Sequence, residues 1–266
     1  MVSQGLLKYA LVTHADVDLA ISEGLRYNWS HVNKFGRNPD VDTTSDPEDV
    51  WTQGGLWVPP TAARTHDLVS SDTNDTSAGT GMRTLMIQGL DANFDLQSEA
   101  ITLNGTSNVA TANAYIRIFR MYGTAWGSGN ANAGNITATA QTDSTVTAQI
   151  RAGDNQTLMA IYTIPNGYTG YMTQFGASIN KSGATAGAMA DISLYKADAE
   201  NSPNARLVQH TAGIAVDGAS LVDHRFHPNK VVAEKTDLIL SVDGVTDNNT
   251  DISGWFDIIL HKEDDN

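Results

Sequence analysis

Hydrophobic and polar residues alternate with a period of two along most of the chain beyond residue 65. Met82–Leu90, Tyr115–Met121 and Gly170–Ile179 show this alternation, which is typical of β-strands whose successive side chains point to opposite faces of a sheet. The turn-forming pairs Asn104–Gly105 and Asn166–Gly167 follow such runs. The pattern predicts about a dozen short strands and almost no helix, so we expect an all-β fold built as an antiparallel, jelly-roll-like β-sandwich.

The strand pattern divides the chain into three regions, of which two are β-rich. Residues 153–266 carry the strongest patterns, at a spacing that fits a jelly-roll-like sandwich of about eight strands. Residues 61–152 form either extra strands of that sandwich or a first β-sandwich, and the polar stretch Arg151–Asn155 marks the boundary. Only residues 16–25 have a helical pattern, with aspartates suited to cap its start.

The third region, residues 1–60, is rich in aromatic residues and proline but shows little periodicity. Four of the seven prolines lie there, together with Trp29, Phe35, Trp51 and Trp57. Such a stretch does not form a core of its own, so we expect an extended N-terminal arm whose four rings bind a partner protein. The alternative is a loop that folds back on its own domain.

The composition narrows the classes of partner. The chain has 16 Lys and Arg against 30 Asp and Glu, a net charge of −14, so DNA, RNA and anionic membrane surfaces would repel it. Charged residues make up only 17%, and the remaining polar surface of Asn, Thr, Ser and Gln is suited to contacts with other proteins. The absence of cysteine excludes disulfides, thiolate metal sites and a cysteine nucleophile, and no cofactor is expected.

The N-terminal residues carry no targeting signal that we recognise. Residues 1–11 lack the charged start and cleavage site of a signal peptide. No apolar run approaches the length of about 18 residues that a membrane helix needs. We therefore expect the chain to act where it is made, or to be packaged into a particle assembled there.

One acidic loop has the composition of a cation site. Asp243, Asp247 and Asp251 lie between two strong strands, and hard oxygen ligands on a loop are what Ca²⁺ requires. The spacing of an EF-hand is absent, so an exposed hairpin loop is the favoured interpretation and no metal site is predicted.

No catalytic constellation is found either. His224 and His227 lie three positions apart, which sends them to opposite faces of a strand and away from a shared site with His210. Neither a Gly-x-Ser-x-Gly elbow nor a phosphate-binding loop occurs. We therefore name no catalytic residue and do not expect an enzyme.

Trp126 supports a different kind of function. It lies in a glycine-rich loop, and an exposed indole there is suited to stacking on sugar rings. The alternative is packing at a subunit contact, since tryptophan favours protein interfaces for the same amphipathic reason.

Several short motifs in the sequence resemble those of a protein family. The motifs are Phe35–Pro39, Glu48–Trp51, Gly54–Gly55, Ala78–Thr84, Gln88–Asn93 and Gln156–Pro165. Over roughly residues 33–180 they resemble virion structural proteins of tailed bacteriophages, particularly phages of aquatic bacteria. The resemblance implies a decoration or cement protein of the head, or an accessory of the tail, and it transfers no functional residue.

The expected function is therefore that of a non-enzymatic virion protein, assembled in the host cytoplasm, that binds and stabilises the capsid. Its partners would be the major capsid protein and other virion proteins, and it would form a homo-oligomer, with a trimer favoured. The alternative is a tail or fibre accessory domain that binds cell-surface carbohydrate through Trp126.

Overall fold

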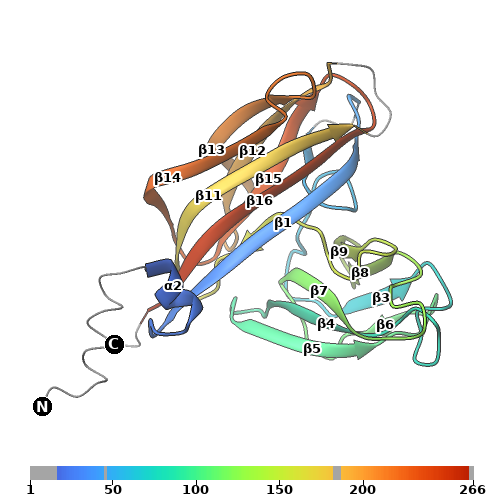
Figure 1. Ribbon diagram of the computed structural model, residues 1–266. Coiled ribbons are helices and arrows are strands. Elements are labelled where there is room, and N and C mark those ends of the chain that lie inside the picture. Colours follow the sequence, from blue (N-terminus) through green and yellow to red (C-terminus); the bar gives the residue numbers. More distant parts are fainter. Residues whose placement is uncertain (1–16, 45–46, 182–186, 264–266) are drawn as a thin grey trace, which may run out of the picture.

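The computed structural model describes residues 17–44, 47–181 and 187–263. Within these ranges the chain forms one short helix, α2 (Val17–Ser22), and sixteen strands, and all the strand pairs are antiparallel (Figure 1). This confirms the expected all-β antiparallel fold. None of the described residues belongs to a helix with the length and apolar character needed to cross a membrane.

Two sheets face each other in the larger part of the molecule, which we call the sandwich (Figure 1). The first sheet has the order β1 (Trp29–Val41), β16 (Thr250–Lys262), β11 (Tyr168–Lys181), β14 (Leu221–Val232). The second has the order β10 (Ile161–Thr163), β15 (Thr236–Val245), β12 (Met189–Asp198), β13 (Ser202–Ala215), and β2 (Glu48–Asp49) also pairs with β15. One apolar cluster takes Phe175 and Phe256 from the first sheet and Leu194 and Leu240 from the second, so the two sheets share a core.

A long insertion interrupts the strand beside β15. Asp49 lies opposite Ser241, and Ile161 lies opposite Ile239, so β2 and β10 follow one another along the same side of β15. The chain leaves this line at Trp51 and returns at Met159, and these two residues form an antiparallel bridge. We call residues 51–159 the inserted unit.

The inserted unit contains two small sheets. Their orders are β6-β3-β8-β9 and β5-β4-β7. The strands are β3 (His66–Ser70), β4 (Met82–Leu90), β5 (Leu96–Thr102), β6 (Val109–Ala110), β7 (Arg117–Trp126), β8 (Ile136–Ala140) and β9 (Val146–Ile150). A second apolar cluster, which includes Leu68, Leu85 and Ile136, fills the space between them.

The structure corrects the expected N-terminal arm. Residues 29–41 form an edge strand of the first sheet, in register with β16 from Trp29 opposite His261 to Val41 opposite Thr250. At Gly36 a Cβ atom would lie only 2.3 Å from backbone atoms of Val50 and Ala160, so glycine lets β1 pass against the start and end of the insertion. Residues 1–16 of the expected arm lie outside the described residues.

The expected boundaries at residues 60 and 153 do not follow the structure. The sandwich joins residues 29–49 with residues 160–263 of the described chain, and the inserted unit lies between them in sequence. The predicted helix over 16–25 is present in part, as α2, and the alternations over 82–90 and 170–179 are confirmed as β4 and β11.

Candidate functional site

Trp51 and Trp57 lie in the core of the inserted unit. Each side chain is 3% exposed. The indole Nε1 of Trp51 donates to the carbonyl of Gly55 at 2.9 Å, and that of Trp57 donates to the carbonyl of Thr147 at 3.0 Å. Because their faces and polar edges are satisfied within the chain, the prediction that these two rings bind a partner is wrong, and the alternative of a segment folded back on its own domain holds for them.

Trp29 and Phe35, in contrast, lie on β1 and are not buried. The Trp29 ring packs against His261 and Tyr171, with ring centroids 4.4 and 5.7 Å away. Phe35 is 40% exposed. A role for these two rings in binding a partner stays a prediction.

Trp126 lies at the end of β7 and is exposed. Its Nε1 donates to Oδ1 of Asn155 at 2.9 Å. A Cβ atom at Gly123 would lie 2.6 Å from the Trp126 ring, so the indole rests directly on that glycine. Part of the indole ring and its only hydrogen-bond donor are therefore occupied within the chain. Less of the ring surface is free to stack on a sugar than the sequence suggests.

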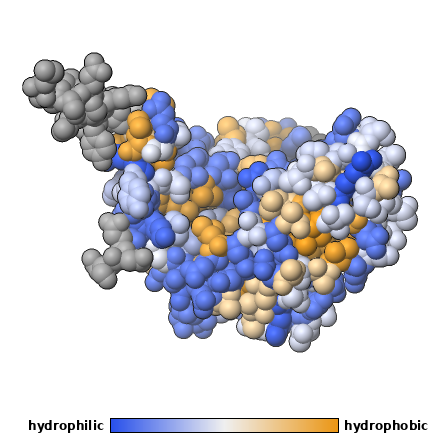
Figure 2. All heavy atoms as spheres, turned by 90° about the horizontal axis from the view of Figure 1, so that it is seen from below, coloured by the Kyte–Doolittle hydropathy of each residue, from blue (hydrophilic) through white to orange (hydrophobic). Residues whose placement is uncertain are grey.

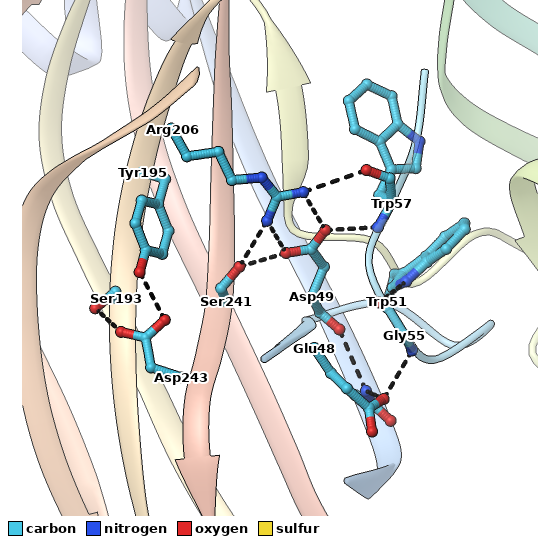
Figure 3. A network of polar contacts seen from close by, with 11 residues as sticks. Glu48, Asp49, Trp51, Gly55, Trp57, Ser193, Tyr195, Arg206, Ser241 and Asp243 are labelled. Atoms are coloured by element: carbon cyan, nitrogen blue, oxygen red, sulfur yellow. Dashed lines mark hydrogen bonds and ion pairs between the residues drawn. The ribbon is translucent and has the colours of Figure 1, made fainter. Parts of the chain in front are cut away.

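Asp49 is the centre of a polar network on the second sheet (Figure 3). Its carboxylate is fully buried and receives two hydrogen bonds from the Arg206 guanidinium, at 2.6 and 2.8 Å. It also accepts the Trp57 backbone N–H at 2.7 Å and the Ser241 hydroxyl. This network fixes the chain around β2 to β13 and β15 at the point where the insertion begins.

Two further carboxylates lie close to this network (Figure 3). Glu48 accepts the Asn38 amide at 2.8 Å and the Gly55 backbone N–H at 2.7 Å. Asp243 accepts the Tyr195 hydroxyl at 2.7 Å and the Ser193 hydroxyl. Burial and the Asp243 carboxylate raise the pKa of Tyr195, so its hydroxyl stays protonated and acts as a donor.

The chemistry of this region is that of a structural clamp. The Ser193 and Ser241 hydroxyls donate to the carboxylates of Asp243 and Asp49. The clamp holds the segment that carries Leu56 and Val58, and both of these apolar side chains are exposed beside a cavity of about 390 Å³. The sequence contains no signal for this clamp, because its members are up to 192 positions apart.

The carboxylates of the possible cation loop are directed to separate partners. Asp243 binds Ser193 and Tyr195, whereas Asp251 forms a two-bond ion pair with Arg37 at 2.6 and 2.8 Å. No group of three His, Asp or Glu side chains with the spacing of a metal site is found among the described residues.

β13 and β14 form one side of the sandwich. The two strands are the last in their respective sheets among the described residues, and they are 14 and 12 residues long. They carry four large apolar side chains that are 52 to 67% exposed: Leu207, Val208, Leu221 and Val231. We call this surface the open edge.

Histidine and phenylalanine rings join the two strands of the open edge. The His210 ring on β13 stacks on the His224 ring on β14, with centroids 4.0 Å apart, and Phe175 and Phe226 pack around the pair. Burial, with His224 and Lys230 nearby, lowers the pKa of His210. His227 instead lines a groove on the outer side with Gln174 and Asp257, so the predicted divergence of His224 and His227 is confirmed.

Polar residues dominate the face of the molecule seen from below. Figure 2 shows hydrophilic residues over most of this face, with hydrophobic residues in small groups between them. Four of the exposed large apolar side chains of the described residues lie on the two strands of the open edge.

Comparison with known proteins gives little further information. No family model matches the chain, and no curated protein does. Among solved structures, the chain is similar to one from the structure of infectious bursal disease virus Gt strain, with 10% identity over 89% of this chain and 77% of that chain. The TM-score of that match is 0.17, too low to bear on fold or function.

Proposed function

We propose that this chain is a non-enzymatic structural protein of a tailed-bacteriophage virion, which binds and stabilises the capsid as a decoration or cement protein. The observation that carries the proposal is the open edge, where two neighbouring edge strands expose large apolar side chains. Other copies of the chain and the major capsid protein are the partners. The open edge on β13 and β14 provides the main contact.

The strand order supports a jelly roll. If β2 and β10 count as one interrupted strand, the sandwich has eight strands in chain order. The first sheet then holds strands one, eight, three and six, and the second holds two, seven, four and five. This order matches that of a jelly roll, an architecture that viral capsid proteins and lectins use, and so supports the proposal.

The energetics of the open edge favour association. Long edge strands present unpaired N–H and C=O groups that another strand can bind, and monomeric proteins normally protect such edges with charges or short strands. Burial of apolar surface contributes about 25 cal/mol per Å², and a stable contact buries about 800 Å² on each partner. Leu207, Val208 and Val231 would lie within such a contact, and Leu221, at the other end of β14 from Val231, would lie at its periphery.

The test combines oligomeric state with attachment to particles. The double variant Leu207→Lys/Val231→Lys places two charges on the open edge, while Tyr27→Lys changes a residue that is 84% exposed elsewhere. We expect the full chain and the Tyr27 variant to form a closed oligomer by light scattering and to bind purified capsids. The double variant should be monomeric and should not bind.

Two results would overturn the proposal. One is a wild-type chain that stays monomeric and does not attach to capsids. The other is a folded double variant, with an unchanged circular dichroism spectrum, that assembles and decorates capsids as well as the wild type.

A further inference from the structure

A cleft of about 440 Å³ lies between the sandwich and the inserted unit. Residues 30–35 of β1 form one wall, and residues of all three strands of the β5-β4-β7 sheet form the other. Ser98, Gln88 and Arg120 of that second wall lie side by side across β5, β4 and β7. β1 is the terminal strand of its sheet among the described residues. We call this cleft the edge slot.

The β1 wall of the edge slot is a strand edge, whereas the opposite wall is a face of the β5-β4-β7 sheet. Side chains alternate between the faces of a sheet, so a cavity lined by six consecutive residues of one strand borders its backbone edge. Six residues of extended chain span about 20 Å. The β1 wall therefore presents backbone donors and acceptors along a length suited to a short extended peptide.

The charge of the edge slot is opposite to that of the whole chain. None of its lining residues is Asp or Glu, although the chain contains 30 of them. The lining includes Lys34 and Arg120, and neither forms an ion pair with a carboxylate of the described residues. The slot is therefore a cationic site in a protein of net charge −14.

Lys34 is the most unusual of these groups. It is only 7% exposed, and its Nζ donates to the carbonyl of Phe119 at 2.5 Å. Burial, with repulsion from Arg120, lowers the pKa of Lys34 to about 7. A carboxylate placed beside the two side chains would relieve their repulsion and would restore the charge of the amine.

Apolar and amide side chains complete the edge slot. Phe35 and Leu96 lie on opposite walls and are exposed. Gln88, Gln97 and Gln156 add amide groups that both donate and accept hydrogen bonds. This combination is suited to a peptide with acidic and apolar side chains.

We propose that the edge slot binds an extended, acidic peptide segment of another protein as an added β-strand on the free edge of β1, with one of its carboxylates at Lys34 and Arg120. The unpaired backbone edge of β1 favours a peptide over an acidic sugar, which has no repeating amide pattern. The inference does not depend on the virion assignment.

The first test measures binding to the full chain by isothermal titration at pH 7 and low salt. The probe is a capped octapeptide that alternates aspartate with valine, and its control has asparagine in place of aspartate. We expect saturable binding of the acidic peptide only. Arg120→Gln and Lys34→Met should each weaken it about 10-fold, whereas Arg151→Gln, an exposed arginine outside the slot, should leave it unchanged.

The second test is amide hydrogen exchange on the bound protein. Addition of a strand should protect backbone amides within residues 30–35, a change that a diffuse charge contact would not produce. The proposal is overturned if the acidic peptide does not bind, if it binds without this protection, or if the Arg120 and Lys34 variants bind normally. Saturable binding of a glucuronate oligosaccharide without binding of the peptide would also overturn it.

Discussion

Arg117 and Asp237 form a buried, two-bond ion pair that joins the inserted unit to the sandwich. Nε and Nη2 of Arg117 lie 3.0 and 2.9 Å from the two carboxylate oxygens of Asp237. Arg117 also donates to the carbonyl of Ile116, and Asp237 accepts the Thr163 hydroxyl. Since Arg117 lies on β7 and Asp237 on β15, this pair fixes one side of the edge slot relative to the other.

Removal of one partner of this pair should destabilise the protein strongly. Arg117→Met leaves the Asp237 carboxylate buried without its ion-pair partner, which costs about 3–5 kcal/mol. Arg64→Met is the control, because the Arg64–Asp143 pair is partly exposed and such pairs contribute about 1 kcal/mol or less. Urea unfolding measures both changes, and similar losses for the two variants would contradict the prediction.

Asp75 should be a second strongly stabilising carboxylate. It is fully buried and accepts backbone N–H groups of Met82, Ala133 and Gly134 at 2.7 to 2.9 Å. In Asp75→Asn the charge is lost and an NH₂ group faces these donors, so we expect a loss of about 3 kcal/mol and a lower thermal midpoint. Asp191→Asn, on the exposed side of β12, serves as the control. Equal midpoints for the two variants would show that the Asp75 bonds contribute little.

The sequence predicted the strands whose pattern is local, and it failed where the pairing is distant. β4 and β11 alternate clearly, but β1 contains Gly36 and Pro39, which normally count against a strand. Pro39 is tolerated because β1 is an edge strand with a register shift between Asn38 and Val41. Partners more than 200 positions away, such as those of β1 in β16, leave no local periodicity.

The candidate sites were harder to predict than the strands. Aromatic content alone grouped Trp51 and Trp57 with Phe35, although two of these rings are core residues and one is exposed. No spacing rule relates Lys34 to Arg120, because Lys34 lies on β1 and Arg120 lies within the inserted unit, and only folding brings them to one cleft. The position of the open edge is not predicted from the sequence for a similar reason, since the alternation of apolar and polar residues does not show which strands end a sheet.

His66 should make the protein sensitive to acid. It is fully buried, its Nδ1 lies 2.9 Å from the carbonyl of Arg64, and its Nε2 has no hydrogen-bond partner among the described residues. Burial lowers the pKa of His66 to about 4, so its contribution to stability is complete above pH 6.5 and is lost as the pH falls from 6.5 to 4. Linkage gives a loss of about 2 kcal/mol between pH 7.5 and 5.

The variant His66→Asn isolates this contribution, because its amide can still donate to the same carbonyl but does not titrate in this range. Urea midpoints at pH 7.5 and 5 should differ less for the variant than for the wild type. His227→Asn, at an exposed position on β14, should retain the wild-type acid sensitivity. The prediction fails if the two variants respond to pH in the same way.

Because of Lys34, the folded protein should be less stable at neutral pH than at alkaline pH. The pKa of Lys34 is about 7 in the folded state, against 10.5 for an unperturbed lysine. Between these two pH values folding therefore releases a proton, and the free energy of unfolding rises as the pH increases from 7 toward 10.5. Linkage gives a gain of about 3 kcal/mol between pH 7 and 9.5, and this gain should be absent from Lys34→Met. Guanidinium unfolding of both proteins at these two pH values measures the difference. If the free energy of unfolding changes equally with pH in the two proteins, burial does not hold the Lys34 amine neutral.

The acidic octapeptide should reduce the pH dependence that Lys34 causes, because a carboxylate beside Lys34 favours its charged form and stabilises the folded protein most at pH 7.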